Sequence, residues 1–305
     1  LTEALNSLRD QSFGNFEVLL VDDGSTDGSE AICDKFATID SRFAVIHQEN
    51  SGVSIARNMG INQATGKYLY FFDADDRLGL SAINSWYKKF NEHDVDAVFF
   101  EAQTFSDEAD LDISKFKYNR GLNGTTRKVL SSTYIGNELE NGRHTSSPCC
   151  YVFKRSLLSG LTFKPGIIHE DELFYIQLFV INKINLYVDN NVYFYRRLRS
   201  SSIMGSPTSD KNFYGYLTVY ETAVEELNAN MNSEQKKTLV LFLSYILYGI
   251  ASTSLKIDGM PVSWLKRKLL IKNVMKKGLF KLFNLKPVVV AFFPEILILK
   301  GKSYG

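Results

Sequence analysis

Four short apolar runs alternate with helical stretches over the first hundred residues, and this alternation restricts the fold more than any other feature. The runs are residues 18–21, 43–49, 67–72 and 94–102. Strands that are nearly continuous apolar runs and alternate with helices form parallel sheets that are covered on both faces. We therefore expect an α/β fold, with a mostly parallel sheet and helices on both of its faces.

The composition agrees with a folded chain and gives no sign of a nucleic-acid binder. The 305 residues are 45% hydrophobic, which is enough apolar surface for one large or two modest domains. Lys and Arg number 35 against 34 Asp and Glu, so the net charge is only +1 and we expect no nucleic-acid partner. Three cysteines lack CxxC spacing, which favours a reducing compartment and no structural zinc.

The charge is unevenly distributed along the chain. Residues 256–305 carry eleven Lys and Arg against Asp258 and Glu295, so this stretch is strongly basic and the rest is acidic. Within it, residues 264–285 alternate cationic and apolar side chains at helical intervals. Such a helix can lie on an anionic membrane surface; the alternative is a helix packed on the protein with a solvated basic face. We favour peripheral attachment to the membrane surface.

A second apolar stretch lies just before this basic region. Residues 238–255 contain no charged side chain, and their number approaches the roughly 20 apolar residues of a membrane span. Serine, threonine and glycine dilute the hydrophobicity of the stretch. We therefore favour a buried helix over a membrane-spanning one.

Acidic residues follow two of the predicted strands. Asp22 and Asp23 come after the first run, and Asp73, Asp75 and Asp76 after the third. Ligands of open α/β sheets bind outside the carboxyl ends of the strands, so we expect the five carboxylates to meet at one edge. In an extended segment Asp73 and Asp75 point the same way, which suits Mg²⁺ or Mn²⁺ bridging to phosphate oxygens. The alternative is a turn with solvated aspartates.

Four segments together resemble the family 2 inverting glycosyltransferases, which build bacterial capsular, exopolysaccharide and lipopolysaccharide sugars. They are FEVLLVDDGSTDGS, NSGVSIARNMGINQATGKYLYFFDADD, HEDELF and YRRLRSSSIM. The resemblance implies a nucleotide-diphospho-sugar-binding, GT-A-like catalytic domain in residues 1–205, followed by a helical, basic C-terminal region, 206–305. It also implies metal-assisted transfer, with inversion at the anomeric carbon, from a UDP-sugar to a saccharide or polyprenyl-linked acceptor. Together with the basic region, this predicts a cytoplasmic protein, peripheral on the inner face of the plasma membrane.

The resemblance assigns several residues to the nucleotide-sugar donor. Asp23, with Asp22 beside it, would contact the base or ribose, and Arg57 would reach the nucleotide or its phosphates. A planar, permanently charged guanidinium suits that task, although exposed arginines on helices are common. Arg196 and Arg199 lie in a segment whose cations would neutralise the donor phosphates. Because this segment is one residue longer than is usual in the family, which of its arginines faces the site stays open.

The metal and donor phosphates are assigned to the DxD pair. Asp73 and Asp75 correspond to this pair, and Asp73 is expected to serve both donor and metal. Asp75 is the preferred ligand of Mg²⁺ or Mn²⁺, and Asp76 is the reserve.

Transfer also needs a base that accepts the proton of the acceptor hydroxyl. The segment HEDELF offers Glu170, Asp171 and Glu172, and neighbouring helix positions point about 100° apart, so at most one of them faces the sugar. By the resemblance we choose Asp171, with Glu170 and His169 as positioning groups. The alternative is an ordinary acidic first turn of a helix.

The beginning of the sequence departs from the family pattern. Family members normally start with an apolar strand that ends near Pro-Xaa-Tyr-Asn, lies centrally in the sheet and helps to hold the base. Here residues 1–8 instead place leucine and alanine on one face of a helix. We therefore expect the chain to begin inside a helix, with the first strand of the family missing, a gap in the sheet and weak donor binding.

Two other classes of protein are alternatives to this family. A non-catalytic binding or scaffold subunit of a polysaccharide assembly complex would retain the fold, but it would not need both the DxD pair and Asp171. A dinucleotide-dependent oxidoreductase is disfavoured, because no GxGxxG follows a strand. The sequence therefore favours a metal-dependent glycosyltransferase.

Overall fold

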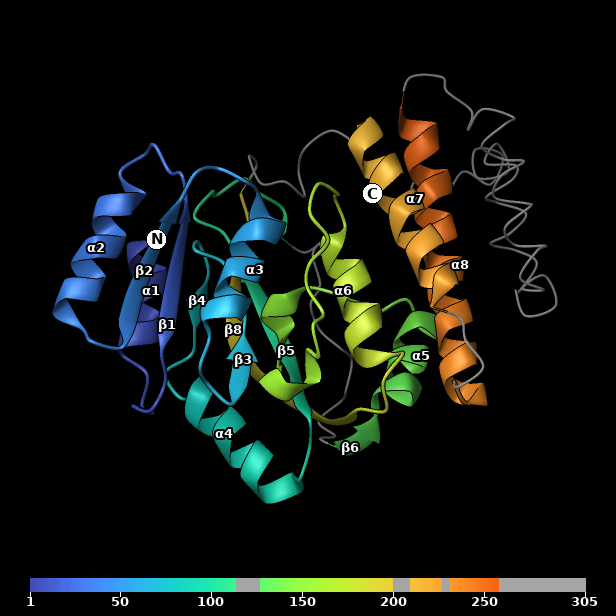
Figure 1. Ribbon diagram of the computed structural model, residues 1–305, viewed down its shortest axis with the longest axis horizontal. Coiled ribbons are helices and arrows are strands. Elements are labelled where there is room, and N and C mark those ends of the chain that lie inside the picture. Colours follow the sequence, from blue (N-terminus) through green and yellow to red (C-terminus); the bar gives the residue numbers. More distant parts are fainter. Residues whose placement is uncertain (114–126, 200–208, 227–230, 258–305) are drawn as a thin grey trace. The chain divides into compact units, whose positions relative to one another are not determined.

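The computed structural model describes residues 1–113, 127–199, 209–226 and 231–257 (Figure 1). Contacts divide the chain into two compact units. The first unit combines residues 1–131, 143–166 and 183–206, and the second combines 132–142, 167–182 and 207–305. Since each unit joins separate stretches of the chain, the single domain boundary after residue 205 stays a prediction.

The first unit begins with helix α1 (Thr2–Arg9). Ala4, Leu5 and Leu8 are buried on one face of this helix, as their three- and four-residue spacing requires. The expectation of a helix with these residues on one face is confirmed.

A parallel β-α-β unit follows α1. Strand β1 (Val18–Asp23) pairs in parallel with β2 (Phe43–Gln48), and helix α2 (Ser29–Ile39) connects them. Helix α3 (Val53–Gln63) then packs on β1. This arrangement follows from the first two apolar runs, because parallel neighbours need a crossover, usually helical.

The other strands form a separate mixed sheet. In spatial order they are β3 (Tyr68–Tyr70), β7 (Tyr151–Lys154), β5 (Ala97–Phe105), β8 (Asn185–Arg197) and β4 (Arg77–Leu78), and β6 (Arg127–Leu130) also pairs with β8. The long pair β5 and β8 is parallel, and the remaining pairs are antiparallel. Within the described strands, β1 and β2 form no ladder with this sheet.

The α/β class is confirmed, with two additions. The third apolar run forms β3 as expected, but its antiparallel pairing with β7 and the short strand β4 were not predicted, since such pairing depends on residues distant in the sequence. The stretch between residues 103 and 147 contributes β6 and helix α5 (Ser131–Glu140).

The core of the first unit is aromatic. Trp86, on helix α4 (Ala82–His93), stacks on Phe100 with ring centroids 4.8 Å apart. Cys149 and Cys150, in a short 3-10 helix (Pro148–Cys150), are fully buried in the same core. These cysteines and Cys33 are free, so no disulfide constrains the unit.

The second unit is helical. Helix α6 (Glu170–Phe179) packs on α7 (Asp210–Glu225), and α7 packs on α8 (Ser233–Lys256). Ile246 and Ile250 of α8 are fully buried, so the expectation of a buried helix over residues 238–255 is confirmed. Within the described ranges, no helix has the length and apolar character needed to cross a bilayer. The basic segment 264–285 lies outside these ranges.

Candidate active site

The DxD motif lies in a turn rather than in an extended strand. Strand β3 ends at Tyr70, and the backbone N–H of Asp76 donates to the carbonyl of Asp73 at 3.2 Å. This bond curls the segment, so Asp73 and Asp76 share a partner while Asp75 contacts another. The expectation that Asp73 and Asp75 point the same way is therefore wrong for this conformation.

Arg196, near the end of β8, holds the two inner carboxylates. Its Nη1 lies 2.6 Å from Asp73 Oδ2 and 3.2 Å from Asp76 Oδ2. Arg57, from α3, approaches the other oxygen of Asp73 at 3.6 Å. Burial raises the pKa of Asp73, but Arg196 and Arg57 lower it by more, so the carboxyl stays below its ordinary value. Asp73 is thus an ionised group between two guanidinium ions.

Asp76 is fully buried. Its Oδ1 accepts the backbone N–H of Arg197 at 2.7 Å. Burial is the largest influence and raises the pKa of Asp76 to about 7, although Arg196 and the Arg197 N–H act in the opposite direction. Asp76 therefore changes its charge near neutral pH.

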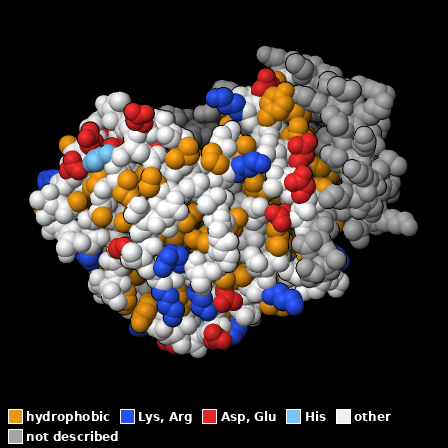
Figure 2. Space-filling model, in the orientation of Figure 1, with side chains coloured by type: hydrophobic (Ala, Val, Ile, Leu, Met, Phe, Trp, Pro, Cys, Tyr) orange, Lys and Arg blue, Asp and Glu red, His pale blue; other side chains and the backbone are white. Residues whose placement is uncertain are grey.

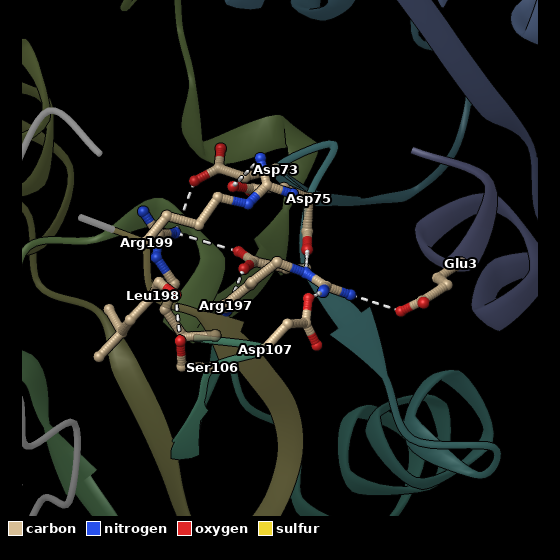
Figure 3. Close-up of polar contacts among 10 residues, drawn as sticks. Glu3, Asp73, Asp75, Ser106, Asp107, Arg197, Leu198 and Arg199 are labelled. Atoms are coloured by element: carbon tan, nitrogen blue, oxygen red, sulfur yellow. Dashed lines mark hydrogen bonds and ion pairs between the residues drawn. The ribbon is translucent and has the colours of Figure 1, made fainter. Parts of the chain in front are cut away.

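Arg197 and Arg199 complete the arginine group (Figure 3). Arg197 donates from Nε to the Asp75 carbonyl at 2.9 Å, and its guanidinium also pairs with Glu3 and Asp107. Arg199 approaches the Asp75 carboxylate at 4.0 Å. All three arginines of the segment thus contact the acidic turn.

Sequence reasoning missed several members of this site. Arg197 was left open, and Glu3, Asp107 and Cys149 were not considered. Side chains alternate between the two faces of a strand. This alternation could have indicated that Arg196 and Arg197 contact different partners. No local pattern indicates Cys149, whose Sγ lies 3.9 Å from Arg196 Nη1.

The acidic turn can supply ligands to a divalent cation. One ligand atom each from Asp73, Asp76 and Cys149 lies within 4.8 Å of the others. Arg196 already pairs with the two aspartates of that group, whereas the Asp75 side chain is 41% exposed. An open carboxylate is the type of ligand that Mg²⁺ and Mn²⁺ prefer. Asp75 is therefore the more accessible carboxylate for such an ion, and its role as a ligand stays a prediction.

The end of β1 forms a second acidic cluster. Asp23 accepts from the backbone N–H groups of Ser51 and Gly52, both at 2.8 Å, and from Gln48 at 2.7 Å. Burial raises the pKa of Asp23, but these hydrogen bonds lower it by more. The carboxylate is therefore ionised and fixes the loop after β2. Contact between the Asp23 carboxylate and a nucleotide base or ribose stays a prediction.

Asp22 is buried beside Asp23. It accepts from the Ser25 N–H at 3.1 Å and lies 3.0 Å from His47 Nδ1. His47 also belongs to an exposed group with Glu30 and Asp34, and Figure 2 shows acidic side chains around a histidine at the surface over α2. The meeting of this cluster with the DxD turn at one edge stays a prediction.

The proposed base belongs to the second unit. His169 caps α6 with a left-handed backbone, φ 72°, and stacks on Tyr216 of α7 at 3.7 Å between centroids. The side chain of Glu172 is buried and accepts from the Tyr245 hydroxyl at 3.1 Å, whereas Asp171 is only partly buried. These surroundings favour Asp171 over Glu172 as the group that can meet a substrate. The role of Asp171 stays a prediction.

The fold has the architecture of GT-A-like glycosyltransferases. It superposes on the S. aureus protein TarS, residues 1–349, in complex with UDP-GlcNAc, with a TM-score of 0.60 and 20% sequence identity. The superposition covers 100% of this chain and 89% of that one.

Sequence comparison gives the family directly. Residues 1–162 match the sequence model of glycosyl transferase family 2, and the chain therefore belongs to this family. Glycosyltransferase GlyG of Streptococcus pneumoniae is 32% identical over 209 residues, which are 67% of this chain and 68% of GlyG. The minor teichoic acid biosynthesis protein GgaB of Bacillus subtilis is 27% identical over 99% of this chain, but the match spans only 32% of GgaB.

Proposed function

We propose that this chain transfers a sugar, with inversion at the anomeric carbon, from a UDP-sugar to a saccharide or lipid-linked saccharide acceptor in cell-surface polysaccharide synthesis. The observation that carries the proposal is the contact between the DxD turn and three arginines of one segment. The teichoic acid relative and the UDP-GlcNAc complex of the structural neighbour support the reaction class and the donor.

The first unit would hold the donor. Arg57, Arg196 and Arg199 offer fixed positive charge to the two phosphates, and Asp23, with Asp22, would contact the base or ribose. Asp75 would hold Mg²⁺ or Mn²⁺, with Asp73 beside it. When bound, such an ion supplies positive charge to the departing diphosphate.

The second unit would activate the acceptor. Asp171 accepts the proton of the acceptor hydroxyl as its oxygen attacks the anomeric carbon. The new bond joins this oxygen to the anomeric carbon, the bond from that carbon to the diphosphate oxygen breaks, and UDP leaves with the bonding electrons. Attack opposite the leaving group inverts the configuration.

The location of the protein is also part of the proposal. The basic region, residues 256–305, would attach the enzyme peripherally to the inner face of the plasma membrane. A polyprenyl-linked acceptor would then lie within reach.

The test measures release of UDP from UDP-GlcNAc at millimolar donor, with and without Mn²⁺. Asp75→Asn and Asp171→Asn should each lower the rate by about 100-fold or more. Asp10→Asn is the matched control, because Asp10 is exposed and its ion pair is with the adjacent Arg9. Equal rates in all variants would refute the assignment, and donor binding without any turnover would favour the scaffold alternative.

A further inference from the structure

A pocket lies in the second unit beside the residue that precedes the acidic motif of α6. Its volume is about 270 Å³, just below the ~300–1,000 Å³ of pockets that bind drug-sized ligands. His169 lines it together with side chains of α7 and α8. A space of this size suits one small ring rather than an extended chain.

Close helix packing builds one wall of the pocket. A Cβ on Gly215 of α7 would lie 2.2 Å from the carbonyl oxygen of Ile168, so only glycine allows the helix to approach the chain there. This approach brings His169 onto the Tyr216 ring, with an interplanar angle of 18°. His169 keeps a left-handed backbone that few non-glycine residues adopt. Such strain persists where the surroundings fix it, and it is common at binding sites.

A second glycine brings the same aromatic ring against α8. A Cβ on Gly249 would lie 2.9 Å from Cζ of Tyr216. No side chain therefore separates the ring from the α8 backbone at this position. Tyr248, next to Gly249, also lines the pocket, so aromatic rings from both helices border the space.

The polar groups that line the pocket are uncharged. They include the amide of Asn212 and the hydroxyls of Ser252 and Thr253. Burial lowers the pKa of His169, so its ring is neutral at pH 7, and its buried Nε2 has no hydrogen-bond partner in the described part of the chain. Among the described lining residues there is no Lys or Arg that would attract an anion.

A pyranose ring matches this lining. Its C–H groups form apolar patches that pack on aromatic rings, while its hydroxyls need neutral donors and acceptors. A phosphate or carboxylate would instead need a cation to offset its desolvation. Glu172, whose carboxylate accepts from Tyr245 of the pocket wall, adds negative charge nearby.

We propose that this pocket binds a neutral pyranose ring of the saccharide acceptor, an inference that rests on the proposed glycosyltransferase function. His169 joins the pocket to the base, because Asp171 follows two residues later on the same segment. A sugar held against His169 and Tyr216 would thus belong to the acceptor rather than to the nucleotide.

The test measures binding of methyl glycosides by saturation-transfer NMR, without donor. Methyl β-glucopyranoside and methyl N-acetyl-β-glucosaminide are the neutral probes, and methyl β-glucuronide is the anionic one. We expect the intact chain to bind at least one neutral probe about tenfold more tightly than the glucuronide. Tyr248→Ala, which removes a ring, and Ser252→Leu, which fills the space, should each weaken that binding at least tenfold.

Tyr214→Ala is the matched control. Tyr214 lies on α7, is 50% exposed and is not among the residues that line the pocket. The Tyr214→Ala variant should bind the glycosides as the intact chain does. Unfolding midpoints should show that all variants remain folded. Equal binding by the intact chain, Tyr248→Ala and Ser252→Leu would overturn the proposal, as would preference for the glucuronide.

UDP release measured on the same samples separates the two hypotheses. Normal release without pocket-dependent glycoside binding overturns the pocket proposal and leaves the transfer reaction in place. Glycoside binding that depends on the pocket, without any UDP release, supports the sugar site and overturns the transfer reaction.

Discussion

Arg196 Nη1 lies 2.6 Å from Asp73 Oδ2, although 123 positions separate the two residues in the sequence. Strand pairing produces this contact. Arg77, just after the acidic turn, pairs with Tyr195 on β8, and on the other side of β8 Arg196 pairs with Thr104 of β5. The position of the arginine is therefore fixed by backbone ladders on both sides of its strand.

Removing this arginine should lower the free energy of unfolding, because two carboxylates lose the cation that they share. Arg196→Ala leaves Asp73 and the buried Asp76 without their shared cation, and breaking a largely buried pair from one side costs about 3 kcal/mol or more. Arg199→Ala is the control, because Arg199 is 47% exposed and 4.0 Å from Asp75, and exposed pairs contribute less than about 1 kcal/mol. Urea denaturation of both variants at pH 8 checks this, and equal losses would contradict it.

Stability should also depend on the protonation of Asp76. Its folded pKa of about 7 lies above the ordinary value of 3.8, so the folded chain binds the proton more tightly than the unfolded chain. The stability contributed by the protonated group is complete below about pH 4 and is lost as pH rises to about 7. Asp76→Asn, which cannot ionise, should therefore cost more stability at pH 5 than at pH 8.

The measurement is urea denaturation at the two pH values, in buffer with a chelator so that no metal ion intervenes. Asp10→Asn serves as control and should change stability equally at both. A cost of Asp76→Asn that is the same at pH 5 and pH 8 would show that the buried carboxyl does not titrate in this range.

The pKa of His47 should also lie above its ordinary value, but here the cause is contact with carboxylates rather than burial. Hydrogen bonds to Asp22 first, and then to Asp34, raise its pKa above 6.5. The stabilisation from this pair is fully present below about pH 6.5 and is lost as pH rises through the folded-state pKa. NMR titration should show the pKa of His47 falling more in Asp22→Asn than in Asp34→Asn. No change in Asp22→Asn would mean that the contact is absent in solution.

The sequence predicts local elements well where one periodicity dominates. The apolar runs 18–21 and 43–49 form β1 and β2, and the spacing of Leu5 and Leu8 forms α1. These predictions succeed because burial of one face or run is a property of neighbouring residues. The cluster of aspartates in the acidic turn was likewise visible, since these residues lie within four positions.

What could not be predicted depends on pairing between distant segments. Arg197 contacts Glu3 and Asp107, and Arg196 lies near Cys149, yet none of these pairs shares a local pattern. At Asp73 the extended segment was preferred to a turn, because the hydrogen bond from the Asp76 N–H that forms the turn cannot be seen in an apolar strand followed by aspartates. Tertiary contacts, rather than propensity, decide such details.

The two glycines of the helical unit should tolerate alanine differently, because the atoms they face differ in freedom to move. At Gly215 the new methyl group would meet a backbone carbonyl at 2.2 Å, whereas at Gly249 it would meet the ring of Tyr216 at 2.9 Å. A backbone cannot yield without moving the start of α6, so Gly215→Ala should cost about 3 kcal/mol or more. A side-chain ring can tilt, so Gly249→Ala should cost only about 1 kcal/mol.

Gly14→Ala provides the matched control for this pair, since nothing lies within 4 Å of its new methyl group. With no clash to relieve, the alanine restricts the unfolded chain and should stabilise by up to about 1 kcal/mol. Urea denaturation of the three variants gives the ranking. A tilted Tyr216 would also narrow the pocket that we propose for the sugar. Gly249→Ala should therefore reduce the free energy of glycoside binding by more than it reduces the free energy of unfolding. A larger loss in the free energy of unfolding would argue against the contact between Gly249 and Tyr216.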